Sequence, residues 1–224
     1  MYRHFFKRLI DILLSFIAIV ILLPFWIPVI IILLLTGEHE VFYFQKRIGY
    51  KNREFYIWKH ATMLKNSENM KGGVHTTRND PRVLPFGAFL RKTKINELPQ
   101  LINIFKGDMS IIGPRPMVEK TFTPYPKHVQ ENIYNVKPGL TGIGSIIFRD
   151  EEKLLSETKM DPKEFYARHI SPYKGELELW YQKNLSFWTD IKLFFCTAWV
   201  VIFPESGLPF KIFKGLPPKP AVLN

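Results

Sequence analysis

The feature that most limits the fold of this chain is an apolar run near its start. From Ile12 to Leu35, a stretch of 24 residues, every residue is apolar except Ser15. A helix needs roughly 20 such residues to cross a bilayer. A cleaved signal peptide fits less well, because the run is too long for its apolar region and no small-residue cleavage site follows. The sequence therefore predicts a segment embedded in a lipid bilayer.

Two prolines within this run argue against a straight transmembrane helix. Pro24 and Pro28 interrupt the helical hydrogen bonds and should kink the chain sharply. The part before them would make a helix of about 18 Å, too short to cross a hydrocarbon core of about 30 Å. Basic residues flank both ends, so the positive-inside rule is satisfied if both ends stay cytoplasmic. We expect residues 1–38 to form a re-entrant helix-break-helix hairpin or an in-plane segment, with Pro24 at the break.

The net charge of the chain points to an anionic partner. Its 31 lysines and arginines against 20 acidic residues give +11, which suits nucleic acid, anionic lipid or a phosphorylated substrate. The sequence has a membrane segment and no nucleic-acid-binding motif, so no nucleic-acid partner is expected. Asp11, at the mouth of the apolar run, is expected to lie at the membrane interface beside Lys7 and Arg8.

The rest of the chain has the pattern of an α/β domain that is mostly helical with a small sheet. The patterns predict strands at 41–45, 54–58 and 109–112, a loop at 65–82, helices at 84–92 and, interrupted by prolines, at 117–135, and a turn-rich segment at 137–142.

The C-terminal third carries a second strongly apolar helix. Residues 186–203 place six aromatic side chains and several aliphatic ones along the helix, most of them on one broad face, with Asp190 and Lys192 outside that face. Two interpretations stay open: a core helix, or an amphipathic helix at the membrane interface spanning 183–206. The single cysteine, Cys196, lies in this helix and is expected to be buried. The proline-rich tail, 207–224, is expected to carry no chemistry.

The segment 91–116 is the strongest candidate for a functional site. Asn96 is a suitable helix cap, apolar residues follow at helical spacing, and Gly107 is an expected stop signal. The positive end of this helix would face Asn96 and Glu97, which is a favourable place for a phosphate. Arg91 and Arg115 are close in sequence. The segment therefore predicts an anion site.

This segment, NELPQLINIFKGDMSIIGPRP, resembles the signature of the bacterial sugar transferases, the monotopic phosphoglycosyl transferases that begin polyprenyl-linked glycan assembly. The resemblance covers nearly the whole chain. Its other matching pieces lie at Lys7–Asp11, Pro24, Gln45–Gly49, Lys59, Thr62–Met63, Asp80–Arg82, Phe89–Arg91, Lys137–Gly142, Asn184–Ser186 and Asp190.

The resemblance implies a monotopic membrane enzyme with a cytoplasmic catalytic domain, here residues 39–182. Such enzymes use Mg²⁺ to move a sugar 1-phosphate from a UDP-sugar to a polyprenyl phosphate such as undecaprenyl phosphate, and they release UMP. The implied location is the cytoplasmic face of the bacterial inner membrane, and the implied product feeds polysaccharide, O-antigen, capsule or glycoprotein assembly. Which sugar is used, and whether the chain forms a homo-oligomer, stay open.

The catalytic pair of the family is altered in this chain. Similar proteins carry Asp-Glu in the sequence DELPQ, in which the Asp attacks the sugar-bearing phosphate and the Glu assists or holds the metal. Here the Glu is Glu97, but Asn96 stands in the position of the nucleophile, and a neutral amide is a very poor nucleophile. Three interpretations stay open: attack by another carboxylate, Glu97 or Asp108; direct attack by polyprenyl phosphate with Glu97 as base; or a catalytically impaired homologue that binds nucleotide-sugar.

Three arginines are the expected phosphate ligands. Arg91 and Arg115 carry guanidinium groups that suit bidentate phosphate binding, and Arg149 resembles a third family arginine. Asp108 is expected to be a turn cap or, alternatively, a partner of an arginine or the metal. Mg²⁺ would be held by Glu97 and by substrate oxygens. Ala61 stands where the family has an arginine, so one contact of the family is expected to be lost.

Overall fold

The computed structural model of the chain describes residues 2–70, 80–204 and 206–223. Its described part is mostly helical, with two small two-stranded sheets and one long apolar helix, so the predicted α/β class is confirmed. Part of the predicted loop at 65–82, residues 71–79, lies outside the described residues. The preceding part of that loop forms a short 3-10 turn, Ser67–Asn69.

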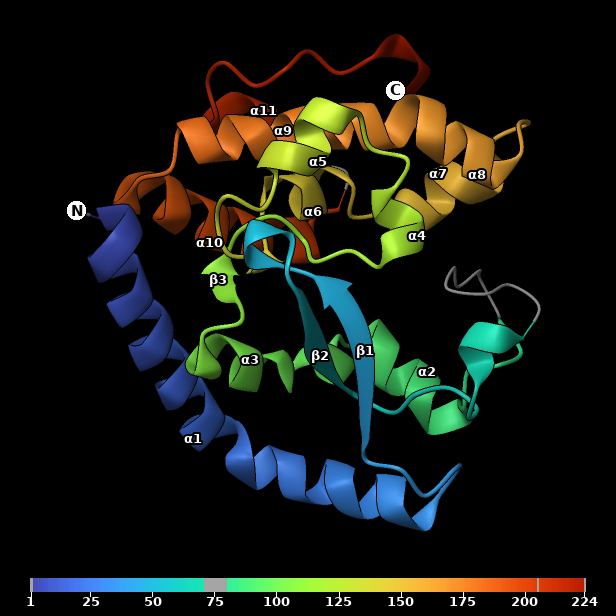
Figure 1. The fold of residues 1–224 in the computed structure, drawn as a ribbon. Helices are drawn as coiled ribbons and strands as arrows, with labels where there is room; N and C mark the ends of the chain where they lie inside the picture. Colours follow the sequence, from blue (N-terminus) through green and yellow to red (C-terminus); the bar gives the residue numbers. More distant parts are fainter. Residues whose placement is uncertain (1, 71–79, 205, 224) are drawn as a thin grey trace.

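The apolar run forms one helix, α1 (Lys7–Leu35), which is preceded by a π-helical turn at Tyr2–Phe6. It is long and apolar enough to cross a membrane, and most of its large side chains are exposed, which is compatible with membrane anchoring. Pro24 and Pro28 lie inside it, and Figure 1 shows a bend near its middle. The expected break at Pro24 is therefore wrong in detail: the prolines bend α1 without ending it, as their missing N–H groups remove few of its many hydrogen bonds.

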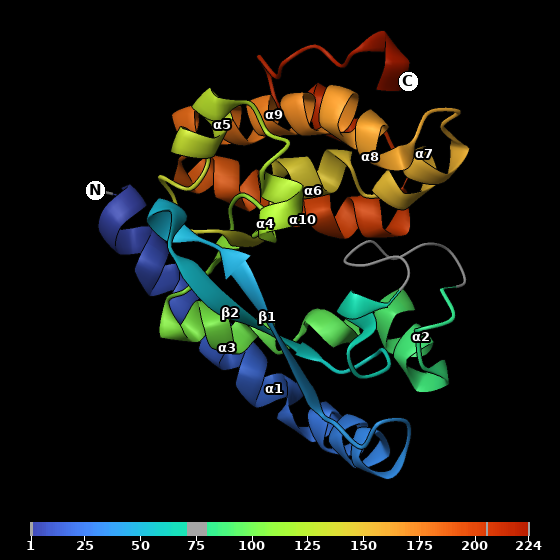
Figure 2. The same ribbon diagram turned by 45° about the vertical axis from the view of Figure 1, so that its right-hand side comes forward.

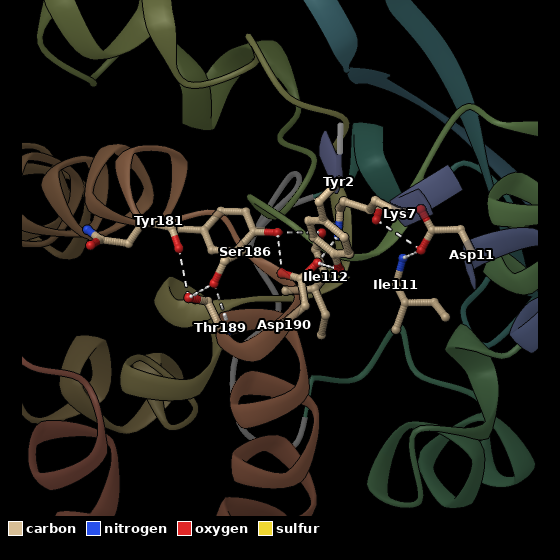
Figure 3. Close-up of polar contacts among 11 residues, drawn as sticks. Tyr2, Lys7, Asp11, Ile111, Ile112, Tyr181, Ser186, Thr189 and Asp190 are labelled. Atoms are coloured by element: carbon tan, nitrogen blue, oxygen red, sulfur yellow. Dashed lines mark hydrogen bonds and ion pairs between the residues drawn. The ribbon is translucent and has the colours of Figure 1, made fainter. Parts of the chain in front are cut away.

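The first turns of α1 are tied to the rest of the protein by a buried polar network (Figure 3). Lys7 Nζ lies 2.6 Å from Asp190 Oδ2, and the hydroxyls of Tyr2 and Tyr181 also donate to Asp190, at 2.7 and 2.8 Å. Asp11 Oδ1 accepts from the backbone N–H of Ile111 and from the hydroxyl of the preceding serine. Asp11 is thus buried against β3 (Ser110–Ile112) rather than exposed, as a residue facing the membrane interface would be.

Two pairs of strands make up the sheets. Strands β1 (Phe42–Ile48) and β2 (Glu54–His60) form an antiparallel hairpin, while β3 (Ser110–Ile112) and β4 (Gly139–Thr141) pair in parallel. The predicted strands are confirmed, but β4 was expected to be a turn. Its glycine allows a very close approach: a Cβ on Gly139 would lie 2.1 Å from the backbone nitrogen of Gly113.

Ten further helices surround the strands in the described residues: α2 (Pro85–Lys92), α3 (Gln100–Lys106), α4 (Glu119–Phe122), α5 (Lys127–Asn132), α6 (Ile143–Ile147), α7 (Glu151–Glu157), α8 (Pro162–Phe165), α9 (Ser171–Lys183), α10 (Phe187–Ile202) and α11 (Leu208–Ile212). The helices expected at 84–92 and 117–135 are confirmed, the second interrupted at its prolines.

The helices fall into two groups. Figures 1 and 2 show α4 to α11 gathered on one side and α1, α2 and α3 on the other, with the β1–β2 hairpin running from one group to the other. The larger core lies in the first group, and a smaller one joins Ile57, Leu101 and Ile104 to the middle of α1. The proline-rich tail packs on the larger core through Phe213 and Leu223.

Helix α10 combines the two interpretations left open by its sequence. Ser186 caps it by accepting from the backbone N–H of Thr189. One face is buried and includes Cys196, as expected. It also includes Asp190, which was expected to lie outside the apolar face of this helix. The opposite face exposes its large apolar side chains: Phe187, Trp188, Phe194, Phe195, Trp199, Val201 and Ile202.

Candidate functional site

The candidate segment turns twice before its helix begins. Lys94 has a left-handed backbone (φ 61°), residues Ile95–Glu97 form a 3-10 turn, and α3 starts only at Gln100. Asn96 therefore does not cap the helix, and this prediction is wrong: Pro99 holds the N-cap position instead. The expected stop is confirmed, because Gly107 ends α3 with φ 101°.

Glu97 and Arg115 form the central ion pair of the site. Arg115 Nη2 donates to Glu97 Oε1 at 2.8 Å. The side chain of Arg115 is 38% exposed and that of Glu97 is 15% exposed. Burial alone would raise the pKa of Glu97, but the charges of Arg115 and Lys59 outweigh it and hold this pKa well below its usual range. Glu97 is therefore a stable anion and a weak base.

Adjacent residues of the 95–97 turn line two different cavities. Glu97 lines a cleft of about 530 Å³, named here the α10 cleft, together with Arg115, Arg149, Lys174 and the outer face of α10. Asn96 lines a second cavity of about 450 Å³, the basic cavity, with Arg47, Lys59, His60 and Arg91. The turn thus stands at the wall of both spaces.

The basic cavity is lined by buried polar atoms that lack hydrogen-bond partners in the described part of the chain. Asn96 Oδ1, Arg47 Nε and His60 Nε2 are buried atoms without a hydrogen-bond partner among the described residues, and all three side chains line this cavity. Buried polar atoms are nearly always paired in folded proteins. The cavity is therefore suited to a polar ligand that carries both acceptors and negative charge.

Lys59 is the most perturbed cation of the basic cavity. Burial, together with the charge of Arg47, lowers the pKa of its ammonium group to about 7, although the charge of Glu97 opposes the shift. The sequence marked Lys59 and Arg47 only as family matches, without a role. A usable signal was the alternation of polar residues on one face of β1, where Tyr43 pairs with Lys59 and Arg47 follows four residues later.

The structure brings only some of the predicted residues together. Arg91 lines the basic cavity, with Nη1 3.7 Å from Met63 Sδ, whereas Arg149 lines the α10 cleft beside Arg115. Asp108 lies at the far end of α3, lines neither cavity and accepts a hydrogen bond from Asn103 at 3.2 Å. This position fits the turn-cap interpretation of Asp108.

A metal site built by the protein alone is not seen in the described residues, which contain no group of three or more His, Cys, Asp or Glu side chains placed to hold an ion. Glu97 is the carboxylate best placed to share a cation with a ligand. Its Oε1 is paired with Arg115, while no hydrogen bond from the described part of the chain reaches its Oε2.

Comparison with known proteins is consistent with this geometry. The family model described as bacterial sugar transferase matches residues 2–204. The chain is 32% identical over 202 residues to a UDP-N-acetylgalactosamine-undecaprenyl-phosphate N-acetylgalactosaminephosphotransferase of Aeromonas hydrophila, covering 88% of this chain and 44% of that protein. It is 34% identical over 195 residues to a UDP-glucose:undecaprenyl-phosphate glucose-1-phosphate transferase of Escherichia coli, covering 86% and 39%.

A shorter relative is matched over most of its length. The exopolysaccharide production protein ExoY of Sinorhizobium fredii is 33% identical over 169 residues, which are 69% of this chain and 74% of that protein. The chain thus spans less than half the length of the Aeromonas and Escherichia relatives, and about three quarters of ExoY.

Proposed function

Because this chain belongs to the bacterial sugar transferase family, we propose that it transfers a sugar 1-phosphate from a UDP-sugar to undecaprenyl phosphate in bacterial glycan assembly. The bond between the two phosphates of the donor breaks, an oxygen of the acceptor phosphate bonds to the sugar-bearing phosphorus, and UMP leaves. The names of the Aeromonas and Escherichia relatives describe this class of reaction. The observation that carries the proposal is the Glu97–Arg115 ion pair beside two cavities that both present cations.

The amide at Asn96 favours direct displacement over a covalent intermediate. Attack on phosphorus by the protein needs a carboxylate at this position, and Asn96 lacks one. Asp108 lines neither cavity, and Glu97 is too strongly stabilised as an anion to be a good nucleophile or base. A phosphate monoester is already largely ionised near neutral pH. The acceptor therefore needs positioning and charge stabilisation more than it needs a base.

The charged residues then have separate tasks. Arg115 and Arg91 hold phosphate oxygens, and Glu97 keeps Arg115 in place. Glu97 fits Mg²⁺ as a single carboxylate ligand through Oε2, with the remaining ligands coming from substrate oxygens and water. When bound, the ion neutralises charge that develops on the diphosphate.

We further propose that α1 enters and leaves the cytoplasmic leaflet of the inner membrane as a bent, re-entrant helix. Basic residues at both ends and the exposed apolar surface of α1 support this placement. The exposed aromatic face of α10 would lie at the same interface. The catalytic unit includes α10 as well as residues 39–182, because α10 forms a wall of the α10 cleft.

The test is UMP release by the full chain in lipid nanodiscs, with Mg²⁺, a panel of UDP-sugars, and undecaprenyl phosphate either present or absent. We expect the wild type to release UMP only with acceptor present, and Asn96→Asp to release one equivalent without it. Glu97→Gln should lower the rate by about a hundredfold, while the exposed control Glu131→Gln should leave it unchanged. No UMP from either the wild type or Asn96→Asp with any donor would refute the proposed function.

A further inference from the structure

One wall of the α10 cleft is apolar. Phe194 and Val201, 48% and 51% exposed, and Ala198 between them project from the outer face of α10 into the lining of the cleft. The same face continues beyond the cleft with exposed Trp188, Phe195 and Ile202. An apolar path therefore leads from the outer surface of α10 to the neighbourhood of Glu97.

Other residues that line the cleft are cationic. Arg115 is paired with Glu97 and Lys174 with Glu151, but Arg149 has no carboxylate partner in the described part of the chain. The guanidinium of Arg149 reaches only the backbone oxygen of Val201, at 3.5 Å. The buried hydroxyl of Ser145 also lines the cleft and lacks a hydrogen-bond partner among the described residues. The cleft thus offers a cation and a free donor beside an apolar wall.

We propose that the α10 cleft binds the lipid acceptor, with the phosphate near Arg149 and Arg115 and the first isoprene units along Phe194, Ala198 and Val201. The UDP-sugar then occupies the basic cavity. This assignment rests on the proposed function for the identity of the acceptor. A phosphate attached to a long apolar chain needs both a cation and an apolar wall, whereas a nucleotide-sugar is polar throughout and suits the unpaired polar atoms around Asn96.

The arrangement suits the chemistry of displacement. Glu97 lines the α10 cleft and its neighbour Asn96 lines the basic cavity, so the two substrates approach the 95–97 turn from different spaces. In-line phosphoryl transfer needs the attacking and leaving oxygens on opposite sides of the phosphorus. Separate cavities for the acceptor and the donor, on either side of the 95–97 turn, are compatible with this requirement.

The first test locates the acceptor without relying on activity. The full chain in nanodiscs is irradiated with a polyprenyl phosphate that carries a diazirine in its first isoprene unit, and the labelled peptides are identified by mass spectrometry. We expect labels on α10 and on residues 143–149, with competition by undecaprenyl phosphate but not by UDP or phosphatidylglycerol. Labels on β1, β2 or α2, or equal competition by phosphatidylglycerol, would overturn the assignment.

A matched pair of variants tests the apolar wall. Ala198→Trp fills the cleft from an exposed position, while Ile202→Trp adds the same group to the same helix outside the lining. We expect Ala198→Trp to raise the KM for undecaprenyl phosphate at least tenfold and to lower photolabelling at least tenfold, with unchanged affinity for UDP. Ile202→Trp should change the KM and the photolabelling by less than twofold. Equal effects of the two variants would refute the proposal.

A second pair tests the cation. Arg149→Met should weaken acceptor binding about tenfold, the loss of one charge-assisted contact, and the exposed control Lys192→Met should not. If the wild type labels on α10 but transfers no sugar phosphate, the proposed function fails and the binding assignment stands. If the protein is active but the photoprobe labels the basic cavity, the binding assignment fails and the proposed function stands.

Discussion

Lys59 gives the basic cavity a charge that changes near neutral pH. Its pKa, lowered by burial to about 7, means that the free protein loses this charge as pH rises through neutrality. UDP-glucose, whose diphosphate does not titrate in this range, should bind about three- to tenfold more weakly at pH 8 than at pH 6. Titration calorimetry between pH 6 and pH 8 measures the affinity for UDP-glucose.

Two variants separate the charge from the shape of Lys59. Lys59→Met should bind weakly at every pH, and Lys59→Arg, which keeps its charge, should bind with little pH dependence. Wild-type affinity that does not change between pH 6 and 8 would contradict the lowered pKa.

Glu178 on α9 is a buried carboxyl that costs stability. It is 2% exposed, and no side chain in the described residues donates a hydrogen bond to either oxygen. Burial raises its pKa to about 8, and Lys174 and the backbone N–H groups of Gly144 and Arg115 offset only part of the shift. Between about pH 5 and 8 the unfolded chain has lost this proton and the folded chain keeps it, so stability falls as pH rises.

Glu178→Gln should remove this slope and stabilise the protein at pH 8 by on the order of 2 kcal/mol. Thermal unfolding at pH 5, 6.5 and 8 measures it. Glu176→Gln, an exposed change on the same helix, should shift the midpoint little at any pH. A variant with an unchanged slope would show that Glu178 ionises normally in the folded protein.

Single residues were predicted well where their role is local and poorly where it is not. Gly107 as a helix stop and Cys196 as a buried residue follow from their neighbours in sequence. Asp11 and Asp190 looked like surface residues because most of the groups that bind them are distant in sequence: Ile111 lies about 100 positions from Asp11, and Lys7 about 180 positions from Asp190. Asn96 looked like a cap because helix caps and tight turns share the same residue types.

At the scale of elements, the attachment of α1 to α10 depends on one carboxylate. Asp190 accepts from Lys7 and from two tyrosine hydroxyls. Asp190→Leu leaves all three donors unpaired and should destabilise the protein by about 3 kcal/mol or more, whereas Lys7→Met leaves Asp190 two donors and should cost about half as much.

Thermal unfolding in detergent, followed by tryptophan fluorescence, checks this order. The double variant Lys7→Met/Asp190→Leu should be more stable than the sum of the two single losses implies, and Lys192→Met on the exposed side of α10 is the control. Equal losses for both single variants would mean that the tyrosines contribute nothing.

Elements with strong periodicity were predictable, and those held by close backbone contact were not. The β1–β2 hairpin and α10 follow from alternation and from helical spacing. Strand β4 was missed because Gly139 and the following Gly142 predict a turn, yet these glycines permit the backbone of residues 139–142 to pack against Gly113. The family resemblance identified the 96–97 pair, but only the fold separates the two side chains into two cavities.

For the whole molecule, the bent α1 predicts that both of its ends lie on one side of the membrane. In a Cys196→Ala background, Arg3→Cys and Glu38→Cys should both react with a membrane-impermeant maleimide in inverted vesicles and in neither case from the outside. Glu131→Cys marks the side of the catalytic domain. Reaction of the two ends from opposite sides would establish a full span instead.

The buried network at Lys7 and Asp11 also sets an order of events during synthesis. The ribosome makes α1 before the residues that α1 contacts: Asp11 can bind Ser110 and Ile111 only after about a hundred more residues have been made, and Lys7 can bind Asp190 only later still. Both charges therefore lack these partners until the segments around Ser110 and Asp190 have been made. We expect the polar contacts that attach α1 to the rest of the protein to form in that order, those of Asp11 before that of Lys7.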